Sequence, residues 1–490
     1  MMKIRYLQHE SCRQRLLNSL FAVVICSHVG CGTDNKPAPP PSPPDTQSSA
    51  SVELSQEPQI DLTNLKSDDP THEVPEEPRH VGTIRRPVSP EPSQSQDTLN
   101  RHGYHRYTSK HLVLFTDIEP EIAQRLVAMV DQEYEAWIKG FGPLPEAADQ
   151  SEFRMIGYLM RDMGALVELG LVPRLYLNMR TGGHIGDRFW MLDQATDYYR
   201  RHLLFHEATH CFMTIMPDTS LPKWYLEGMA EMVATHRLQE DGTIVFGVLP
   251  ENREDYDGWG RIKTIQEEVA AGRFKSIAQL RSIERIDPVD EVRDYAWSWA
   301  LCYFLEKHPR YQERFHSLQT HWRSGAFVDE FDRLFMEDME KLNTEWLLFV
   351  TSLMEGYDLQ RAAMVWNPES DGGNAIVQAD RGWQSTGWTI TEGETYRIIA
   401  DGEVTLANEP KPWVSQPNGI TLEYFSGQPI GRLFGIVVDP AFDRTPQVIE
   451  FGRESSWTAT TSGTLFLRVN DAWNSLYNNS GSYRVTREQK

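Results

Sequence analysis

The residues with the clearest potential for chemistry form the segment His206-Glu207-Ala208-Thr209-His210, which has the spacing H-E-x-x-H. Two histidines four positions apart lie on one face of a helix, so both imidazoles can reach one metal ion. Glu207 points toward the same region and can take a proton from a metal-bound water. A catalytic zinc ion typically has three protein ligands and one open position for water. The pattern therefore predicts a zinc site that needs one more ligand.

The third ligand is expected on the helix that follows. Residues 224–231 have the sequence W-Y-L-E-G-M-A-E, in which Glu227 completes a His2Glu set. The alternative is an amphipathic helix whose histidines only line a polar face. That alternative requires both segments to occur together by accident, so the metal interpretation is favoured.

These two segments resemble the gluzincin metallopeptidases, and in particular their small peptidase MA-like domains, over residues 195–236. In that resemblance His206, His210 and Glu227 are the zinc ligands and Glu207 is the general base. Glu231 falls where the family often places an acid that orients a ligating histidine. Metal-bound imidazoles usually donate their other N–H to a carboxylate, which agrees with that role.

The resemblance also suggests further residues near the site. Related peptidases often place a tyrosine or histidine from a later helix over the substrate carbonyl group, and Tyr295 is the candidate here. Its alternative is a core aromatic residue with a satisfied hydroxyl. His202, four residues before His206, is interpreted as a polar histidine beside the site rather than a fourth ligand. The loop Gly182-Gly183-His184 is a further candidate to approach the cleft.

The elements that must position these residues have an α/β order. Helices are predicted at 119–140, 162–171 and 195–215, and buried strands at 111–116, 153–160 and 188–193, the last as a candidate edge strand. Small gluzincin domains place such a strand beside the active-site helix, where a peptide can bind by strand addition. A break at 216–222 lets the next helix turn back toward the histidines.

More helices follow a predicted hairpin at 237–246, whose turn is Asp241-Gly242. They are expected at 259–271, 276–283, 290–306, 309–324, 327–336 and 339–355. The helix-rich α+β metallopeptidase domain is therefore predicted to span 101–366.

A second, all-β domain is predicted at 375–487, where short β-like runs alternate with Gly, Asp, Asn and Pro at the spacing of a sandwich. Its last part, 470–485, resembles the PA-I galactophilic lectin family. Carried over, the calcium ligands are the side chains of Asp471, Asn478 and Asn479 and the carbonyl of Ser475, and oxygen ligands suit Ca²⁺. The family's galactose-contacting His and Gln have no clear equivalents at 413–419, so calcium is better supported than galactose. The alternative is a turn that binds no ion.

The first 31 residues have the pattern of an export signal. Four basic residues precede an apolar run at 16–29 that is too short to span a bilayer. Gly30 before Cys31 resembles a bacterial lipobox, in which Cys31 becomes the lipidated N-terminus, although His28 departs from the usual pattern. The alternative is a plain secretory signal. The chain is expected outside the cytoplasm, as a membrane-anchored lipoprotein or a secreted protein.

Residues 32–100 are rich in Pro, Ser and Glu and are predicted to form a disordered linker. The net charge of −22 and the lack of a basic patch argue against nucleic acid as a partner. Cys211 and Cys302 lie in apolar helical contexts that suit buried free thiols, with one disulfide between them as the alternative.

Together these features predict an exported zinc metallopeptidase that hydrolyses peptide or protein substrates and carries an accessory domain for calcium or carbohydrate. The rival interpretation is a non-catalytic surface adhesin or glycan-binding lipoprotein with an inactive peptidase-like domain. Intact Glu207 favours the enzyme, because a degenerate copy should lose its base first.

Overall fold

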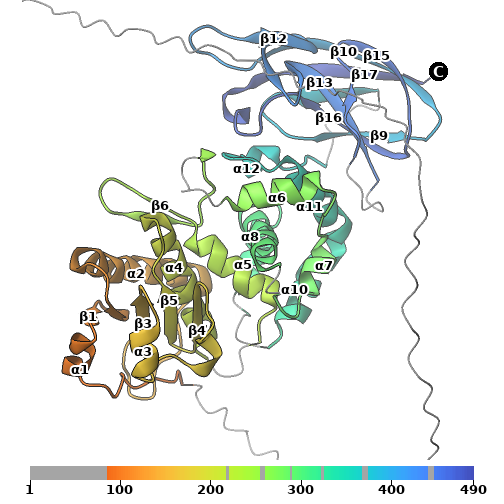
Figure 1. The fold of residues 1–490 in the computed structure, drawn as a ribbon. Coiled ribbons are helices and arrows are strands. Elements are labelled where there is room, and N and C mark those ends of the chain that lie inside the picture. Colours follow the sequence, from red (N-terminus) through yellow and green to blue (C-terminus); the bar gives the residue numbers. More distant parts are fainter. Residues whose placement is uncertain are drawn as a thin grey trace, which may run out of the picture. The chain divides into compact units, whose positions relative to one another are not determined.

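The computed structural model describes residues 85–489 except 217–219, 254–259, 287–289, 320, 322–324, 367–372 and 440–445. The predicted export signal, Cys31 and most of the predicted linker lie outside the described residues. Within them the chain is multidomain, with one part that combines helices and a sheet and another built of β-strands (Figure 1).

The predicted linker boundary at residue 100 is wrong. Arg86 is buried, forms a parallel β-bridge with Ala147 and donates a 2.7 Å hydrogen bond to the carbonyl of Ser151. Helix α1 (Gln96–Arg101) follows and buries Leu99. The polar composition of this stretch concealed the few side chains that anchor it, so the structured part begins before residue 101.

The first sheet has the strand order β1-β2-β3-β5-β4. Strands β2, β3 and β5 are parallel, whereas β1 and β4 run antiparallel to their neighbours. The strands are β1 (His105–Thr108), β2 (Leu112–Thr116), β3 (Met155–Met160), β4 (Gly182–Ile185) and β5 (Arg188–Leu192). The prediction of an edge strand at 188–193 is wrong, because β4 covers that side of β5. The loop predicted at 182–184 is part of strand β4 instead, and two glycines, which have low strand propensity, gave the segment no strand pattern.

Both faces of this sheet are buried, because side chains of a strand alternate between faces. Leu112, Leu114 and Met191 face helices α2 (Pro120–Phe141) and α4 (Asp197–Thr214) in one core. Val113 and Trp190 belong to a second core, with α3 (Gly164–Glu168) on the other side. Figure 1 shows α2 and α4 beside the strands. The predicted helices and strands of this region are confirmed apart from their ends.

The helical region that follows is built around α8 (Glu291–Lys307), which contacts α5, α6, α7, α9 and α11. Every residue from Ala296 to Leu305 is buried, so this part of the helix is enclosed on all sides. The predicted hairpin is β6 (His236–Leu238) with β7 (Ile244–Phe246). The remaining helices are α5 (Lys223–Ala234), α6 (Arg261–Ala270), α7 (Ile277–Arg281), α9 (Gln312–Gln319), α10 (Phe327–Phe335), α11 (Met339–Ser352) and α12 (Leu359–Ala362), with 3-10 turns at Arg174–Tyr176 and Met336–Asp338.

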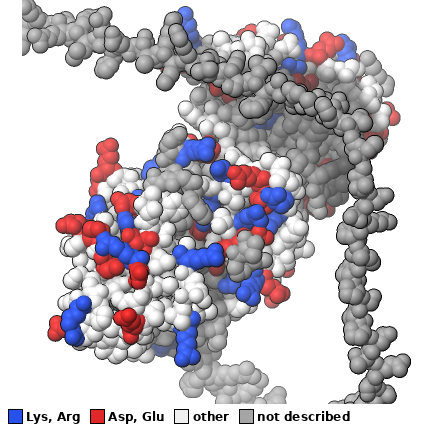
Figure 2. Space-filling view, in the orientation of Figure 1, with Lys and Arg blue, Asp and Glu red and all other residues white. Residues whose placement is uncertain are grey.

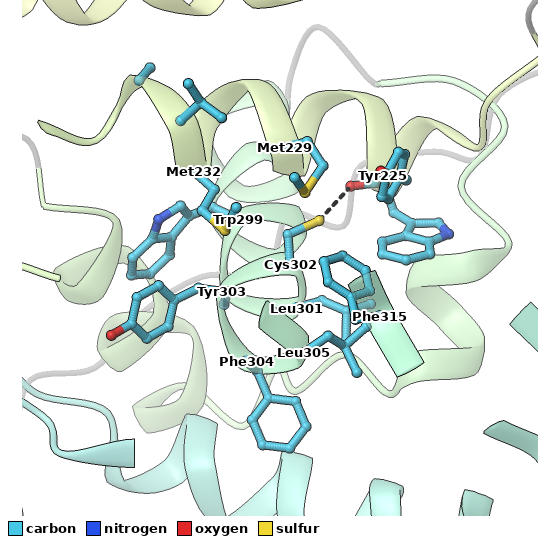
Figure 3. Packing of buried hydrophobic residues seen from close by; sticks show 14 of the residues in the cluster. Tyr225, Met229, Met232, Trp299, Leu301, Cys302, Tyr303, Phe304, Leu305 and Phe315 are labelled. Atoms are coloured by element: carbon cyan, nitrogen blue, oxygen red, sulfur yellow. Dashed lines mark hydrogen bonds between the residues drawn. The ribbon is translucent and has the colours of Figure 1, made fainter. Parts of the chain in front are cut away.

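Helices α5 and α8 pack at very close range. A methyl group at Gly228 would lie 2.4 Å from the carbonyl oxygen of Ser298 and 2.6 Å from the Cys302 sulfur. Figure 3 shows Met229 and Cys302 in this contact, where the thiol donates a hydrogen bond to the carbonyl of Trp224. Cys211 and Cys302 are both buried free thiols, which confirms that prediction over the alternative of a disulfide between them. The glycine after Glu227 therefore has a packing role.

The C-terminal part is a β-sandwich of two five-stranded sheets. One has the order β11-β10-β17-β8 with β15 paired to β10, and the other has β12-β13-β16-β9 with β14 paired to β13. Both sheets contribute to one core, for example Ile398 from β10 and Leu465 from β16. The strands are β8 (Asn374–Gln378), β9 (Gln384–Ile390), β10 (Thr395–Thr405), β11 (Val414–Ser415), β12 (Asn418–Phe425), β13 (Gln428–Val438), β14 (Ile449–Glu450), β15 (Glu454–Thr458), β16 (Gly463–Val469) and β17 (Ser480–Gln489).

Basic and acidic side chains are interspersed on the face shown in Figure 2. Neither sign forms a continuous region there. None of the helices in the described part of the chain combines the length and apolar character that a membrane span needs.

Candidate metal centre

Helix α4 carries the H-E-x-x-H segment, and its start is defined by a cap. Thr196 accepts a 3.3 Å hydrogen bond from the backbone N–H of Tyr199, which satisfies a donor that the first helical turn leaves free. Helix α5 begins after Pro222, whose fixed φ suits the residue before a helix. The two helices pack together, so Glu227 on α5 faces His206 and His210 on α4.

Three ligand-type atoms meet at one point. His210 Nε2 lies 3.0 Å from His206 Nε2 and 2.9 Å from Glu227 Oε2. His206 Nε2 lies 3.6 Å from the same carboxylate oxygen. All three side chains are almost fully buried. Within the described residues, this is the one cluster of at least three His, Cys, Asp or Glu side chains with metal-site geometry.

The spacing fits a zinc ion. Zinc–ligand bonds of about 2.0–2.1 Å in tetrahedral geometry separate the ligand atoms by about 3.3 Å. The three observed separations, 2.9, 3.0 and 3.6 Å, lie on both sides of that value. The donor set of two imidazoles and one carboxylate is also one that zinc accepts in catalytic sites.

Behind the cluster, Glu231 contacts two histidines and an arginine. Its Oε1 lies 3.2 Å from His206 Nδ1, an ion-pairing distance whose angle falls outside hydrogen-bonding geometry. Its Oε2 lies 3.2 Å from His202 Nε2. Arg261 donates to both oxygens, at 2.7 and 2.9 Å. His202 therefore contacts the acid rather than the ligand point, as predicted, whereas Arg261 was not identified from the sequence.

Glu207 lies next to β4, the strand at the edge of the first sheet, rather than next to Glu231. A methyl group at Gly182 would lie 2.4 Å from Glu207 Oε1, so strand β4 passes directly over this carboxylate. His184 on the same strand has its Nδ1 3.7 Å from Glu207 Oε2, and its ring stacks on His210 at 4.4 Å. Tyr176 anchors the strand by donating a 2.5 Å hydrogen bond to the His184 carbonyl. The Gly182–His184 segment thus forms a wall of the site.

Tyr295 on α8 lies beside the metal cluster, but its hydroxyl is engaged elsewhere. Its ring centroid is 5.8 Å from that of His206 in an edge-on arrangement. The hydroxyl donates a 2.9 Å hydrogen bond to Glu291 Oε1. Burial raises the pKa of the tyrosine, and the nearby Glu227 charge adds to the effect, so the phenol stays protonated. Tyr295 is close to the site, with its hydroxyl held one turn away along α8.

A buried hydrogen-bond chain ties the back of α4 to α2. Trp137 Nε1 donates to Thr209 Oγ1 at 3.0 Å, and Thr209 donates to Glu133 Oε1 at 3.0 Å. Burial raises the pKa of Glu133 well above its ordinary value. Thr209 is one of the two variable positions of the H-E-x-x-H segment, and this contact restricts rotation of α4 about its axis.

The electrostatics keep both acids of the cluster ionised. Burial alone would raise the pKa of Glu227, but its contact with His210, which includes a hydrogen bond, and the nearby His206 outweigh burial and lower the pKa to about 2. Burial of Glu231 is likewise outweighed, chiefly by Arg261, and its pKa lies well below the ordinary value. Burial would lower the pKa of His206, but Glu231 outweighs it and raises the pKa to about 9. A cation that binds here must therefore displace a proton from His206.

In the β-sandwich, the residues predicted to bind calcium also come together. Asn479 Nδ2 lies 2.9 Å from Asp471 Oδ2 and 3.2 Å from the Ala379 carbonyl. The amide oxygens of Asn478 and Asn479 are buried with no hydrogen-bond partner among the described residues. Ser475 lies on the same loop, and its carbonyl accepts a 3.4 Å hydrogen bond from Asn478 N–H. Unpaired buried acceptors beside a buried carboxylate suit a hard cation.

Burial raises the pKa of Asp471, although the hydrogen bond from Asn479 opposes the shift. The charge of the buried Arg468 also opposes the shift, so burial is the dominant cause. The predicted ligands Asp471, Ser475, Asn478 and Asn479 therefore share one loop and one region of space.

No family model matches the chain, and no curated protein matches it. One solved structure similar to part of the chain is described as "EclA N-terminal domain; PllA-like lectin". The match covers 24% of this chain and 96% of that chain, with 20% sequence identity and a TM-score of 0.20.

Replacement of a ligand should remove the metal. We expect His210→Ala to lose bound zinc, because two remaining ligands cannot complete a site that requires three. Elemental analysis of the purified full chain measures this loss. His105→Ala is the matched control, because His105 is exposed on β1 and should leave the zinc content unchanged. Stoichiometric zinc in His210→Ala would contradict the assignment.

Proposed function

We propose that this protein is an exported zinc-dependent metallopeptidase with a zincin-like, gluzincin-type catalytic domain. The observation that carries the proposal is the convergence of His206 Nε2, His210 Nε2 and Glu227 Oε2, with Glu207 beside them. The substrate is a peptide or protein, because the gluzincin resemblance implies amide hydrolysis. Export and lipidation at Cys31 stay predictions from the sequence.

When bound, a zinc ion would act as a Lewis acid that lowers the pKa of a water molecule and polarises a carbonyl group. Glu207 is the residue that accepts the proton of the attacking water. Its Oε2 is buried and has no hydrogen-bond partner among the described residues, so this oxygen is free to accept a proton. The leaving amine needs a proton as the amide bond breaks, and the same carboxyl group lies in reach to return it.

The substrate would lie along β4. This strand ends the order of the described sheet, so its outer edge has no strand partner there. An extended peptide can add to such an edge through main-chain hydrogen bonds. Because β4 passes over Glu207, an added peptide would run beside the base. Tyr295 remains the candidate for contact with the carbonyl oxygen, and that role requires its hydroxyl to leave Glu291.

A second proposed function concerns the β-sandwich, which we propose to be a calcium-binding accessory domain with carbohydrate as its candidate ligand. The unpaired buried oxygens of Asn478 and Asn479 beside Asp471 support the cation. The rival hypothesis is a non-catalytic glycan-binding lipoprotein or adhesin. In it the β-sandwich binds its ligand in the same way, but the peptidase-like domain is inactive.

The first test removes the base. We expect Glu207→Gln to keep its zinc and to lose about 10²–10⁴-fold in kcat, the usual contribution of a general base. A mixed-peptide cleavage assay with and without chelator, together with zinc analysis, measures both properties. Glu240→Gln is the control, because Glu240 is exposed near the hairpin turn. Wild-type rates in Glu207→Gln would show that the base is wrongly assigned. Absence of cleavage by wild type would favour the adhesin hypothesis, whereas cleavage that a chelator does not inhibit would contradict the proposed zinc dependence.

A second test changes the wall above the base. Gly182→Ala places a methyl group 2.4 Å from Glu207 Oε1, closer than van der Waals contact allows, so the carboxylate must move. Displacement of a catalytic group by about 1 Å can cost about 100-fold in rate, and we expect a loss of that order with zinc retained. Gly140→Ala is the control, since a methyl group there meets nothing. An unchanged kcat/KM in Gly182→Ala would place the working position of Glu207 elsewhere.

A third test addresses calcium. We expect calorimetric titration of the full chain with Ca²⁺ to show a binding event that Asp471→Asn abolishes, because the substitution removes the carboxylate charge and keeps its shape. Asp401→Asn is the control, since that carboxylate is largely exposed. Sugars titrated into the calcium-loaded protein then test carbohydrate binding. If wild type shows no calcium heat, or Asp471→Asn keeps it, the proposed ligand set is wrong.

A further inference from the structure

We infer that Arg261 is a positioning residue of the proposed zinc centre. Arg261 holds Glu231 against the ligand His206 and also contacts the ring of Tyr295. This inference rests on the proposed function. Arg261 is the first residue of α6, outside the segments that carry the metal motif. Its contacts reach Glu231 on α5 and Tyr295 on α8, which both lie beside His206.

The contact with Glu231 uses both ends of the guanidinium group. Arg261 Nε donates to Oε2 at 2.9 Å and Nη2 donates to Oε1 at 2.7 Å. The carboxylate is almost fully buried and the arginine is 17% exposed, so water competes little with this pair. A two-point contact fixes the plane of a carboxylate as well as its position, which a single ammonium group cannot do.

The fixed carboxylate in turn fixes His206. Glu231 Oε1, which accepts the shorter arginine bond, is the oxygen that lies 3.2 Å from His206 Nδ1. The other oxygen contacts His202 at 3.2 Å. Neither His206 Nδ1 nor His210 Nδ1 has a hydrogen-bond partner among the described residues, but His206 Nδ1 lies within ion-pairing distance of an acid, and no such pair is described for His210 Nδ1. Among the described contacts, an acid behind a ligand nitrogen therefore lies on the His206 side only, and Arg261 holds that acid in place.

Arg261 also touches the aromatic flank of the site. Its guanidinium carbon lies 5.8 Å from the centre of the Tyr295 ring, within cation–π range. The same ring packs edge-on against His206 at 5.8 Å. One side chain therefore supports His206 by two routes, through the acid and through the tyrosine ring. An arginine that only joined two helices would not need to contact both Glu231 and the Tyr295 ring.

A comparable pair elsewhere in the same domain provides the control. Arg200 at the start of α4 donates to Asp193 Oδ1 at 2.5 Å and to Oδ2 at 3.2 Å, and it is 11% exposed. Like Arg261, it makes a two-point contact in a largely buried setting. No contact described for Arg200 reaches a ligand or Tyr295. Replacement of Arg200 therefore measures what loss of a buried arginine–carboxylate pair does to stability when the pair does not contact the metal cluster.

The experiment compares full-length wild type, Arg261→Lys, Arg261→Met and Arg200→Lys. Zinc affinity is measured by competition with a chromogenic chelator, and the Co²⁺-loaded protein is examined by visible absorption, which reports ligand geometry. Thermal unfolding of the metal-free protein reports stability separately. We expect Arg261→Lys to bind zinc about 10–100-fold more weakly and to alter the Co²⁺ spectrum, the usual scale for loss of a group behind a ligand. Arg200→Lys should change only the thermal midpoint.

The variant Glu231→Gln tests whether Arg261 acts on zinc affinity through Glu231. If Arg261 acts on zinc affinity through Glu231, the double variant Glu231→Gln/Arg261→Lys should bind zinc no more weakly than Glu231→Gln alone. Full additivity would overturn this route. Wild-type zinc affinity and Co²⁺ spectrum in Arg261→Lys would overturn the inference while leaving the zinc centre intact. Wild type that binds neither ion would overturn the proposed function itself. Arg261→Met removes the positive charge as well as the two-point contact, so it should weaken zinc binding at least as much as Arg261→Lys.

Discussion

The structure depends on one costly arrangement, the meeting of two imidazoles and a carboxylate in the interior between α4 and α5. Buried charges are unfavourable unless they are paired, and here each has a partner. Glu227 lies against His210, and Glu231 lies against His206 and Arg261. The surrounding helices hold these partners in place.

Close packing explains why small residues occur where they do. Gly228 lets α8 approach α5, because a larger residue would meet the Ser298 carbonyl and the Cys302 sulfur. Gly182 lets β4 pass over Glu207. The first contact places Tyr295 near the cluster, and the second sets the distance between the sheet edge and the base. Both glycines have negative-φ backbones in regular elements, so space rather than backbone conformation determines their identity.

The two candidate ion sites differ in chemistry in a way that matches their surroundings. The helical site offers two nitrogen atoms and one carboxylate, a set suited to zinc. The loop of the β-sandwich offers Asp471 and the amide oxygens of Asn478 and Asn479, a set suited to calcium. Helices place side chains at intervals of one turn, which suits a few directional ligands. A loop that bends back on itself brings neighbouring oxygens together from a short stretch of chain.

What the sequence by itself determined about this protein is local. The i, i+4 spacing places His206 and His210 on one helical face, and the alternating runs after residue 374 specify β-strands. Glu227 could be assigned because it lies on the next helix after a short break. Only the tertiary structure decided that Arg261, 30 residues from Glu231, reaches it, that His184 stacks on His210, and that β4 is the edge strand. These contacts join residues from separate elements, whose meeting depends on how the helices and the sheet pack, and no periodicity within a segment records that packing.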